Sequence, residues 1–237
     1  MSINIQNTYK SFGKTKVLNG INITFNRGEI VALIGPNGSG KTTLLKSILG
    51  LTIPQKGNIT VFDKPIQKNY TYREHIGYMP QIAHYPENLK VRELIQLFRN
   101  LRNNPPNTDE ELFTKYRIAQ MFEKPLSALS GGQKQKVGAY LAFLFHPDII
   151  ILDEPTAGLD PVSTEIIKAK IYDAKNTGKL IIITTHIMQD ADELADRIVY
   201  LADGNIFLDL TINELKEKTG ETKLIKALAK LIMEHDA

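Results

Sequence analysis

The fold is decided by Ile30–Gly50, IVALIGPNGSGKTTLLKSILG. Residues 30–34 are apolar and mostly β-branched, which predicts a strand buried on both faces. Residues 35–42, GPNGSGKT, match the phosphate-loop pattern G-x-x-x-x-G-K-[ST]. From Thr43 the apolar residues recur at helical spacing, and Gly50 is typical of a helix end. Strand, glycine loop and helix therefore follow in the order that a site for a nucleoside triphosphate requires.

The residue types of this loop suit phosphate chemistry. Gly35, Gly38 and Gly40 allow backbone N–H groups to approach phosphate oxygens closely. The N-terminus of the following helix adds partial positive charge. Lys41 can reach the β- and γ-phosphates, and the Thr42 hydroxyl can ligate Mg²⁺. A glycine-rich turn that matches by chance is the alternative, which the strand-to-helix setting disfavours.

The composition is that of an ordinary soluble globular chain. The 237 residues are 42% hydrophobic and 23% charged, with a net charge of +3 and no cysteine. The small charge disfavours a nucleic-acid partner, and the lack of cysteine excludes disulfides and cysteine-based zinc sites. No apolar run approaches the roughly 20 residues of a membrane span, and residues 1–14 lack the apolar core of a signal peptide. We expect a cytosolic chain unless a membrane protein holds it.

Hydropathy predicts further elements on both sides of the phosphate loop. We expect strands in a hairpin over Ile3–Phe25 with its turn at Gly13, at Asn58–Phe62, within Arg73–Gln81, at Asp148–Leu152, at Leu180–Thr184, and in a hairpin of Arg197–Leu201 and Asn205–Asp209. We expect helices at Asn88–Arg102, Asp109–Phe122, Lys134–Phe145, Pro161–Asn176 and Ile187–Asp196, and one in the tail that carries Leu224, Leu228 and Leu231. The apolar stripe expected on the first of these helices is Leu89, Leu94, Leu97, Phe98 and Leu101. Residues 82–128 thus form a helical block inside an α/β body, and we expect this block to set partner specificity.

Polar side chains follow two of the buried strands. Asp153 and Glu154 end the strand Asp148–Leu152, at the edge where an α/β sheet places its ligand site. Beside a phosphate loop, Asp153 can hold Mg²⁺ through water and Glu154 can orient the attacking water. His186 follows Leu180–Thr184 and can donate to a γ-phosphate oxygen. The alternatives are a solvated pair of carboxylates at a strand end and a histidine with a local partner.

Three weaker signals stay open when each is taken alone. Phe12 lies near the hairpin tip, where it could stack on adenine or serve as a turn aromatic. Gln81 is either a loop amide that contacts ligand or a surface glutamine. The glycine-rich turn at 130–132 precedes a helix, so it is either a second anion site or an N-cap.

Taken together, these motifs resemble the ATP-binding-cassette (ABC) ATPase family. The segments are GPNGSGKTT at 35–43, LSGGQ at 129–133, IIILDEP at 149–155 and AGLD at 157–160, with Phe12, Gln81 and His186 in family order. The resemblance covers nearly the whole chain. It implies an α/β P-loop NTPase with a RecA-like mixed or parallel sheet, an N-terminal antiparallel β subdomain and an inserted α-helical subdomain. The single domain 1–237 would comprise a core at 1–81 and 129–215, helices at 82–128 and a helical tail at 216–237.

The resemblance also implies roles for individual residues. Nucleotide binding would fall to Phe12, Gly35, Asn37, Gly38, Ser39, Gly40, Lys41, Thr42, Thr43, Ser130, Gly131, Gly132, Gln133 and Asp160. Catalysis would fall to Glu154, His186, Gln81 and Lys41, and Mg²⁺ would be held by Thr42, Gln81 and Asp153. Two subunits would pair head to tail, each ATP lying between one phosphate loop and the partner's LSGGQ turn. Lys136 stands where many members have arginine, which keeps the charge but loses the planar fork.

The resulting expectation is an ATP-hydrolysing subunit of a membrane transporter. It would work at the cytoplasmic face with separate permease subunits, as a homodimer, and resembles the ATPases of ABC-2-type exporters, including drug-export and copper-linked nitrous-oxide-reductase maturation systems. The alternative is a soluble assembly ATPase of the iron–sulfur-cluster type. A DNA-repair ATPase would need a coiled-coil insertion, and residues 44–128 contain no sustained heptads. A translation ATPase usually carries two cassettes, and a non-hydrolysing regulator is disfavoured by Glu154 and His186.

Overall fold

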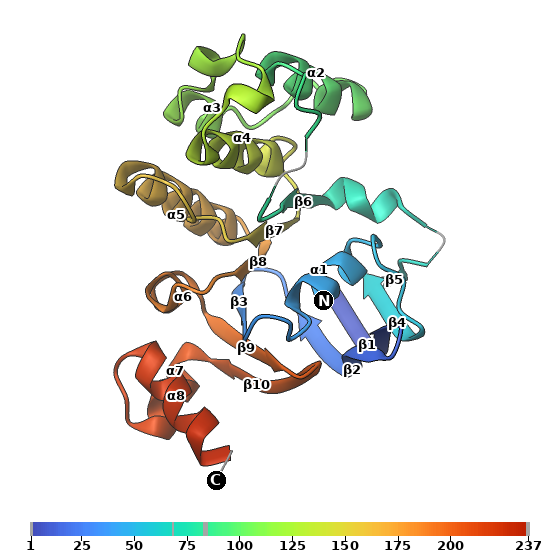
Figure 1. Cartoon of the computed structure of the whole chain (residues 1–237), viewed down its shortest axis with the longest axis vertical. Coiled ribbons are helices and arrows are strands. Elements are labelled where there is room, and N and C mark those ends of the chain that lie inside the picture. The colour runs from blue at the N-terminus through green and yellow to red at the C-terminus, as the bar shows by residue number, and fades with distance from the viewer. Residues whose placement is uncertain (1, 68, 83–84, 236–237) are drawn as a thin grey trace.

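The buried run Ile30–Ile34 is strand β3 of a six-stranded sheet in the order β10-β9-β3-β8-β7-β6 (Figure 1). The computed structural model describes residues 2–67, 69–82 and 85–235. The other strands of this sheet are β6 (Ile76–Met79), β7 (Ile149–Asp153), β8 (Leu180–Thr184), β9 (Arg197–Ala202) and β10 (Asn205–Thr211). Only β10 is antiparallel to its neighbour. Every residue of β3, β7 and β8 is buried, as in a parallel sheet covered on both faces.

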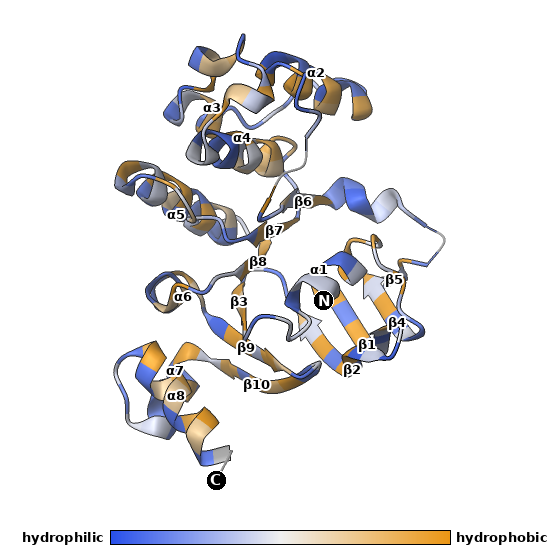
Figure 2. Ribbon diagram, viewed as in Figure 1, coloured by the Kyte–Doolittle hydropathy of each residue, from blue (hydrophilic) through white to orange (hydrophobic). Residues whose placement is uncertain are grey.

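The predicted N-terminal hairpin is confirmed as part of a second, antiparallel sheet in the order β2-β1-β4-β5. Its strands are β1 (Ile3–Phe12), β2 (Thr15–Phe25), β4 (Lys56–Val61) and β5 (Lys64–Pro65). Gly13 makes the turn with a positive φ of 57°. Apolar and polar residues alternate along β1 and β2, which carry bands of orange and blue in Figure 2.

Two apolar cores lie on the two faces of the six-stranded sheet. In β3, Ala32 joins the core that contains α4 and α5, whereas Leu33 joins the core under the antiparallel sheet. Helix α1 (Lys41–Ile48) contributes Leu44 and Leu45 to this second core. The phosphate-loop helix is therefore fixed between the two sheets, and Gly50 ends it with a φ of 66°.

The helical block contains α2 (Val91–Leu101) and α3 (Glu111–Lys115), and α4 (Gly131–Phe143), which follows the block, packs against both. The prediction of one continuous helix over Asp109–Phe122 is wrong. Helix α3 ends at Lys115, Arg117 takes a left-handed φ of 53°, and a 3₁₀ turn follows at Ile118–Met121. Tertiary contacts explain the break: the Tyr116 hydroxyl donates to the Ser163 carbonyl on α5, and Ile118 is fully buried.

The predicted apolar stripe on α2 is also partly wrong. Leu94 is 1% exposed, but Leu97 and Leu101 are 43% and 71% exposed. The buried face instead runs through Val91, Leu94 and Ile95. The spacing allowed either side of the helix to face inward, and packing against the rest of the block decided which one does.

Four helices come after β7 along the chain. Helix α5 (Pro161–Asn176) matches its prediction, and α6 (Met188–Leu194) lies within the predicted range. Helix α7 (Ile212–Thr219) was not predicted, although Thr211 and Glu214 form its capping box, and α8 (Leu224–His235) is the tail helix. In the described part of the chain, no helix combines the length and apolarity needed to cross a bilayer. The expected domain ends at residues 1 and 237, and residues 83–84 of the helical block, lie outside the described residues.

Candidate functional site

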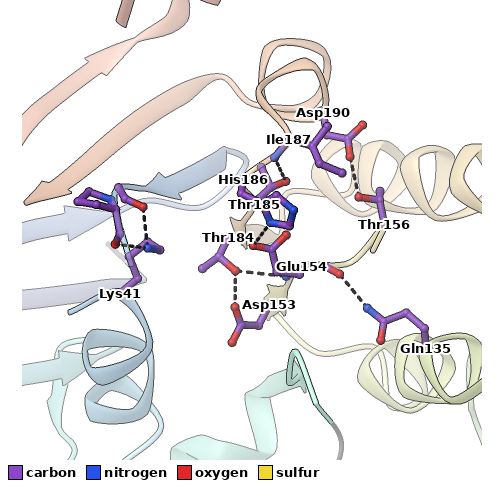
Figure 3. Close-up of polar contacts among 12 residues, drawn as sticks. Lys41, Gln135, Asp153, Glu154, Thr156, Thr184, Thr185, His186, Ile187 and Asp190 are labelled. Atoms are coloured by element: carbon purple, nitrogen blue, oxygen red, sulfur yellow. Dashed lines mark hydrogen bonds and ion pairs between the residues drawn. The ribbon is translucent and has the colours of Figure 1, made fainter. Parts of the chain in front are cut away.

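The carboxyl ends of four parallel strands meet at one edge of the six-stranded sheet. The phosphate loop follows β3, His186 follows β8, Glu154 follows β7 and Gln81 follows β6, and these four strands are neighbours in the sheet. Loops far apart in sequence therefore converge at the place where such sheets bind ligands. Figure 3 shows Lys41 on one side of this edge, with Asp153, Glu154 and His186 beside it.

The loop 35–40 has a backbone that side chains would block. Gly35 has a φ of 146°, and a Cβ added there would lie 2.0 Å from the Leu201 carbonyl oxygen. Gly40 has a φ of 108° and would place a Cβ 2.6 Å from the Val17 carbonyl oxygen. Ser39 is buried and its hydroxyl has no hydrogen-bond partner, whereas Asn37 and Gly38 are exposed. The loop thus presents backbone groups and an unused hydroxyl at the N-terminus of α1.

Lys41 spans this loop with its side chain. Its Nζ donates to the carbonyl oxygens of Gly35 at 2.8 Å and Pro36 at 2.9 Å. Burial lowers the pKa of Lys41, and the nearby carboxylates of Glu154 and Asp153 act in the opposite direction. The ammonium group is thus held at the mouth of the loop by two backbone carbonyls. Thr42 and Thr43 follow in the first turn of α1.

The two acidic residues after β7 have different surroundings. Asp153 accepts a hydrogen bond from the Thr184 hydroxyl on the neighbouring strand. Burial and, less strongly, the negative charge of Asp153 raise the pKa of Tyr78 on β6 to about 12. Glu154 Oε1 lies 2.8 Å from His186 Nδ1, while Glu154 Oε2 is buried without a partner. One oxygen of Glu154 is therefore oriented and the other is free to accept a proton.

The turn of LSGGQ begins α4. The Ser130 hydroxyl accepts from Gln133 N at 3.3 Å, and Gln133 Oε1 accepts from Ser130 N at 3.1 Å, which completes a capping box. Ser130 and Gly131 are exposed. Among the described residues no hydrogen bond joins this turn to the chain's own phosphate loop. The exposed start of α4 is thus not used by the chain's own phosphate loop in the described structure.

Helix α4 instead contacts the segment after Glu154. Gln135 Nε2 donates to the Glu154 carbonyl oxygen at 2.8 Å (Figure 3), and Lys136 Nζ lies 2.9 Å from Asp160 Oδ2. A Cβ on Gly132 would lie 2.8 Å from the Gly158 carbonyl oxygen, so this approach requires glycine. Asp160 is exposed and caps α5, accepting from Ser163 N at 2.9 Å. The lysine and this capping bond lower the pKa of Asp160.

The remaining two predicted residues, Phe12 and Gln81, are exposed. Phe12 is 55% exposed at the hairpin tip, with Lys10 Nζ 5.0 Å from its ring centroid. The side chain of Gln55 fixes the strand beside it through two 2.9 Å bonds to the Ser11 backbone. Gln81 is exposed and lines a hollow together with residues of α4. In the described structure it makes no hydrogen bond to Asp153 or to the phosphate loop.

Two residues that contact Asp153 and Glu154 at this edge were not predicted from the sequence. Thr184 pairs in register with Asp153 across β7 and β8 and orients its carboxylate, while Gln135 holds the Glu154 backbone. Thr184 could have been found as the polar end of an otherwise apolar strand. Nothing in the sequence singles out Gln135.

Comparison with known proteins gives consistent matches. The ABC transporter family model matches residues 18–157. The Nod factor export ATP-binding protein I of Burkholderia lata is 33% identical over 207 residues, which cover 85% of this chain and 68% of that protein. The L-cystine import ATP-binding protein TcyN of Bacillus subtilis is 32% identical over 245 residues, which cover 98% of this chain and 95% of that protein.

Two solved structures agree with these matches. The ATP-binding subunit of an ABC transporter superposes with a TM-score of 0.89 at 28% identity, covering 98% of this chain and 100% of that one. A dimeric bacterial ABC transporter cassette superposes with a TM-score of 0.77 at 26% identity, covering 89% of this chain and 98% of that one.

Proposed function

Because this chain belongs to the ABC transporter family, whose cassettes bind and hydrolyse ATP, we propose that the loop 35–43, Asp153, Glu154 and His186 form its hydrolytic site. The family, the fold class and the ATPase activity predicted from the sequence are confirmed by these matches. The observation that carries the site assignment is Glu154. Its carboxylate is buried, one oxygen is 2.8 Å from His186, and the other has no partner.

The hydrolytic step follows from what each side chain can do. The glycine N–H groups, Lys41 and the N-terminus of α1 hold the phosphates. Glu154 Oε2 accepts the proton of the water that attacks the γ-phosphate. His186 keeps Glu154 Oε1 in place and presents the rest of its exposed ring to the same space.

Thr42 and Asp153 are the residues that would hold Mg²⁺, with Gln81 at the rim. A hydroxyl and one carboxylate suit Mg²⁺, which keeps several waters and takes few protein ligands. Among the described residues no group of three or more His, Cys, Asp or Glu side chains forms a metal cage, in keeping with such a water-rich ion. When bound, Mg²⁺ would neutralise charge on the β- and γ-phosphates.

We also propose that two copies pair head to tail. Ser130 and Gly131 lie exposed at the start of α4, an anion-binding helix end that makes no hydrogen bond to its own phosphate loop in the described structure. A second subunit would supply the phosphate that this end binds. The dimeric cassette that this fold resembles supports the arrangement.

The proposed partner is the cytoplasmic side of a separate membrane permease. A groove of about 340 Å³ between α2 and β6 is lined mainly by apolar side chains, among them Tyr85, Phe98, Leu101 and Phe145. We expect an apolar helix of the permease to occupy it. The export direction is proposed from the relative that carries Nod factor export in its name, at 33% identity, whereas the L-cystine import relative, at 32% identity, points the other way.

A chain of hydrogen bonds joins this groove to the phosphate-loop helix. Arg102, in the groove wall, donates to the carbonyls of Arg73 and Glu74, each at 3.0 Å. The Arg73 side chain donates to the carbonyls of Leu49 at 2.9 Å and Gly50 at 3.1 Å, at the end of α1. An occupant of the groove would thus act on the helix whose other end binds phosphate.

The test is affinity purification of tagged chain from detergent-solubilised cells, with a matched pair of variants. Leu101→Asp places a charge in the groove, and Met233→Asp places one at an equally exposed position of α8, 71% against 72%. We expect a polytopic membrane protein to co-purify with wild type and Met233→Asp but not with Leu101→Asp. Co-purification of soluble proteins alone would contradict the transporter role and favour an assembly ATPase.

A further inference from the structure

Three segments adjoining the proposed hydrolytic site are joined by one buried carboxylate that the mechanism above does not use. Asp190 lies in α6 and is 7% exposed. Thr156, in the turn after β7, and Lys168, in α5, are each 7% exposed and contact it. A buried charge is retained only where its partners compensate for lost hydration, so each of these contacts matters.

The contacts occupy both oxygens of Asp190. The Thr156 hydroxyl donates to Asp190 Oδ2 at 2.6 Å, as Figure 3 shows. Lys168 Nζ lies 3.0 Å from Asp190 Oδ1 and 2.7 Å from Glu193 Oε2. Asp190 is therefore fixed in position by a hydroxyl from one element and an ammonium from another.

The sequence positions of the partners connect this cluster to catalysis. Thr156 is two residues beyond Glu154, and Asp190 is four residues beyond His186. The Thr156–Asp190 bond thus joins the same two loops as the 2.8 Å contact between Glu154 and His186, but on the buried side. His186 is largely exposed, so its own burial does not fix it, and Glu154 has a left-handed φ of 57°, so ordinary backbone preference does not fix its backbone.

We propose that Asp190, with Thr156 and Lys168, is a positioning residue that holds the His186 loop in register with Glu154. This inference rests on the proposed function of Glu154 and His186 and adds the device that aligns them. A displacement of about 1 Å in a catalytic group can cost about a hundredfold in rate. Weakening the buried contacts of Asp190 should therefore lower kcat while nucleotide binding by the phosphate loop persists.

Helix α5 offers a matched control for this idea. Lys170, two residues after Lys168, is 8% exposed, and its Nζ lies 2.6 Å from both Asp109 and Glu111. It therefore makes an equally buried pair of contacts, but to the helical block rather than to the catalytic loops. Lys168→Met and Lys170→Met remove comparable ion pairs from the same helix.

The experiment measures kcat, KM for ATP and Tm for both variants of the full chain. We expect similar losses of Tm, a fall of at least tenfold in kcat for Lys168→Met with KM changed less than threefold, and kcat within twofold of wild type for Lys170→Met. Equal losses of kcat in the two variants would overturn the proposal, because they would show a general effect of stability.

A second pair of variants, with smaller changes at Thr156, tests the proposal if the lysine variants do not fold. Thr156→Val removes the hydroxyl at nearly constant volume and leaves Asp190 Oδ2 without a donor, whereas Thr156→Ser keeps the donor. We expect at least a tenfold lower kcat for the valine variant and wild-type kcat, within twofold, for the serine variant. Wild-type kcat in Thr156→Val would overturn the inference. Sustained turnover of Glu154→Gln would instead overturn the proposed hydrolytic site.

Discussion

Glu154→Gln separates catalysis from stability at the proposed hydrolytic site. The substitution keeps the shape of the side chain and its 2.8 Å neighbour His186, but it removes the negative charge and the basic oxygen Oε2. ATP binding should persist, since the phosphate loop, Lys41 and Thr42 are untouched. Turnover should stop, because the neighbouring carboxylate, Asp153, accepts from Thr184 and is assigned to Mg²⁺.

The expected magnitudes differ for the two properties. Loss of a general base lowers kcat by roughly 10²- to 10⁴-fold, which is about 3–5 kcal/mol in activation free energy. For the free energy of unfolding, the contact with a His186 side chain that is 72% exposed contributes at most about 1 kcal/mol. The substitution also removes a buried charge that has one unpartnered oxygen, and this gain in the free energy of unfolding offsets a similar amount. The net change in stability should stay within about 1 kcal/mol, or a few degrees in Tm.

The assay compares steady-state phosphate release, ATP affinity and thermal unfolding, with Glu110→Gln as the control. Glu110 accepts from Arg99 at 2.6 Å and from the Tyr140 hydroxyl at 3.0 Å, away from the phosphate loop. Its substitution should lower stability by about 1 kcal/mol, since the pair is partly exposed, and leave kcat unchanged. Gel filtration with ATP should show Glu154→Gln as a dimer. A Glu154→Gln chain that turns over within fivefold of wild type would refute the reasoning.

Three further predictions concern binding and packing. Phe12→Ala should weaken ATP binding by roughly 5- to 150-fold through loss of stacking worth about 1–3 kcal/mol; calorimetry with inorganic triphosphate should show no change, and equal losses for both ligands would exclude stacking. Gly77→Ala should destabilise the chain by about 1–3 kcal/mol or more, because its Cβ would lie 1.9 Å from the Ala142 carbonyl oxygen; an unchanged Tm would contradict that clash. In urea unfolding, Leu94→Ala should lower the free energy of unfolding by about 2–5 kcal/mol and Leu97→Ala by under about 1 kcal/mol, since these side chains are 1% and 43% exposed. Similar losses for the two variants would show that both leucines lie on the buried face, as expected from the sequence.

The sequence determined the features that depend on neighbouring residues. The phosphate loop is specified by glycines and by the lysine and threonine within a few positions, and the strands at 149–153 and 180–184 by continuous apolar runs. Helix α5 begins at a capping Asp160 followed by proline, which is why its N-terminal end was predicted. The family resemblance added an order of motifs, and that order identified the class of ATPase.

Local pattern failed where tertiary contacts outweigh propensity. The sequence over Asp109–Phe122 suits a helix, but a left-handed Arg117 turns the chain so that Ile118 enters the core. Similarly, the spacing of leucines on α2 fits two faces, and only packing buries Leu94 rather than Leu97. In each case the free energy of burying a particular side chain decides among conformations that are locally similar.

Only the tertiary structure decided how the proposed catalytic groups meet. Strand order places β8 between β3 and β7, so that Thr184 orients Asp153 and His186 reaches Glu154. The same arrangement buries Asp190 between Thr156 and Lys168. No local pattern encodes these contacts, because they join residues on different elements whose spacing is set by the sheet. The sequence by itself therefore determined which chemical groups this protein carries, and the fold determined which of them act on one another.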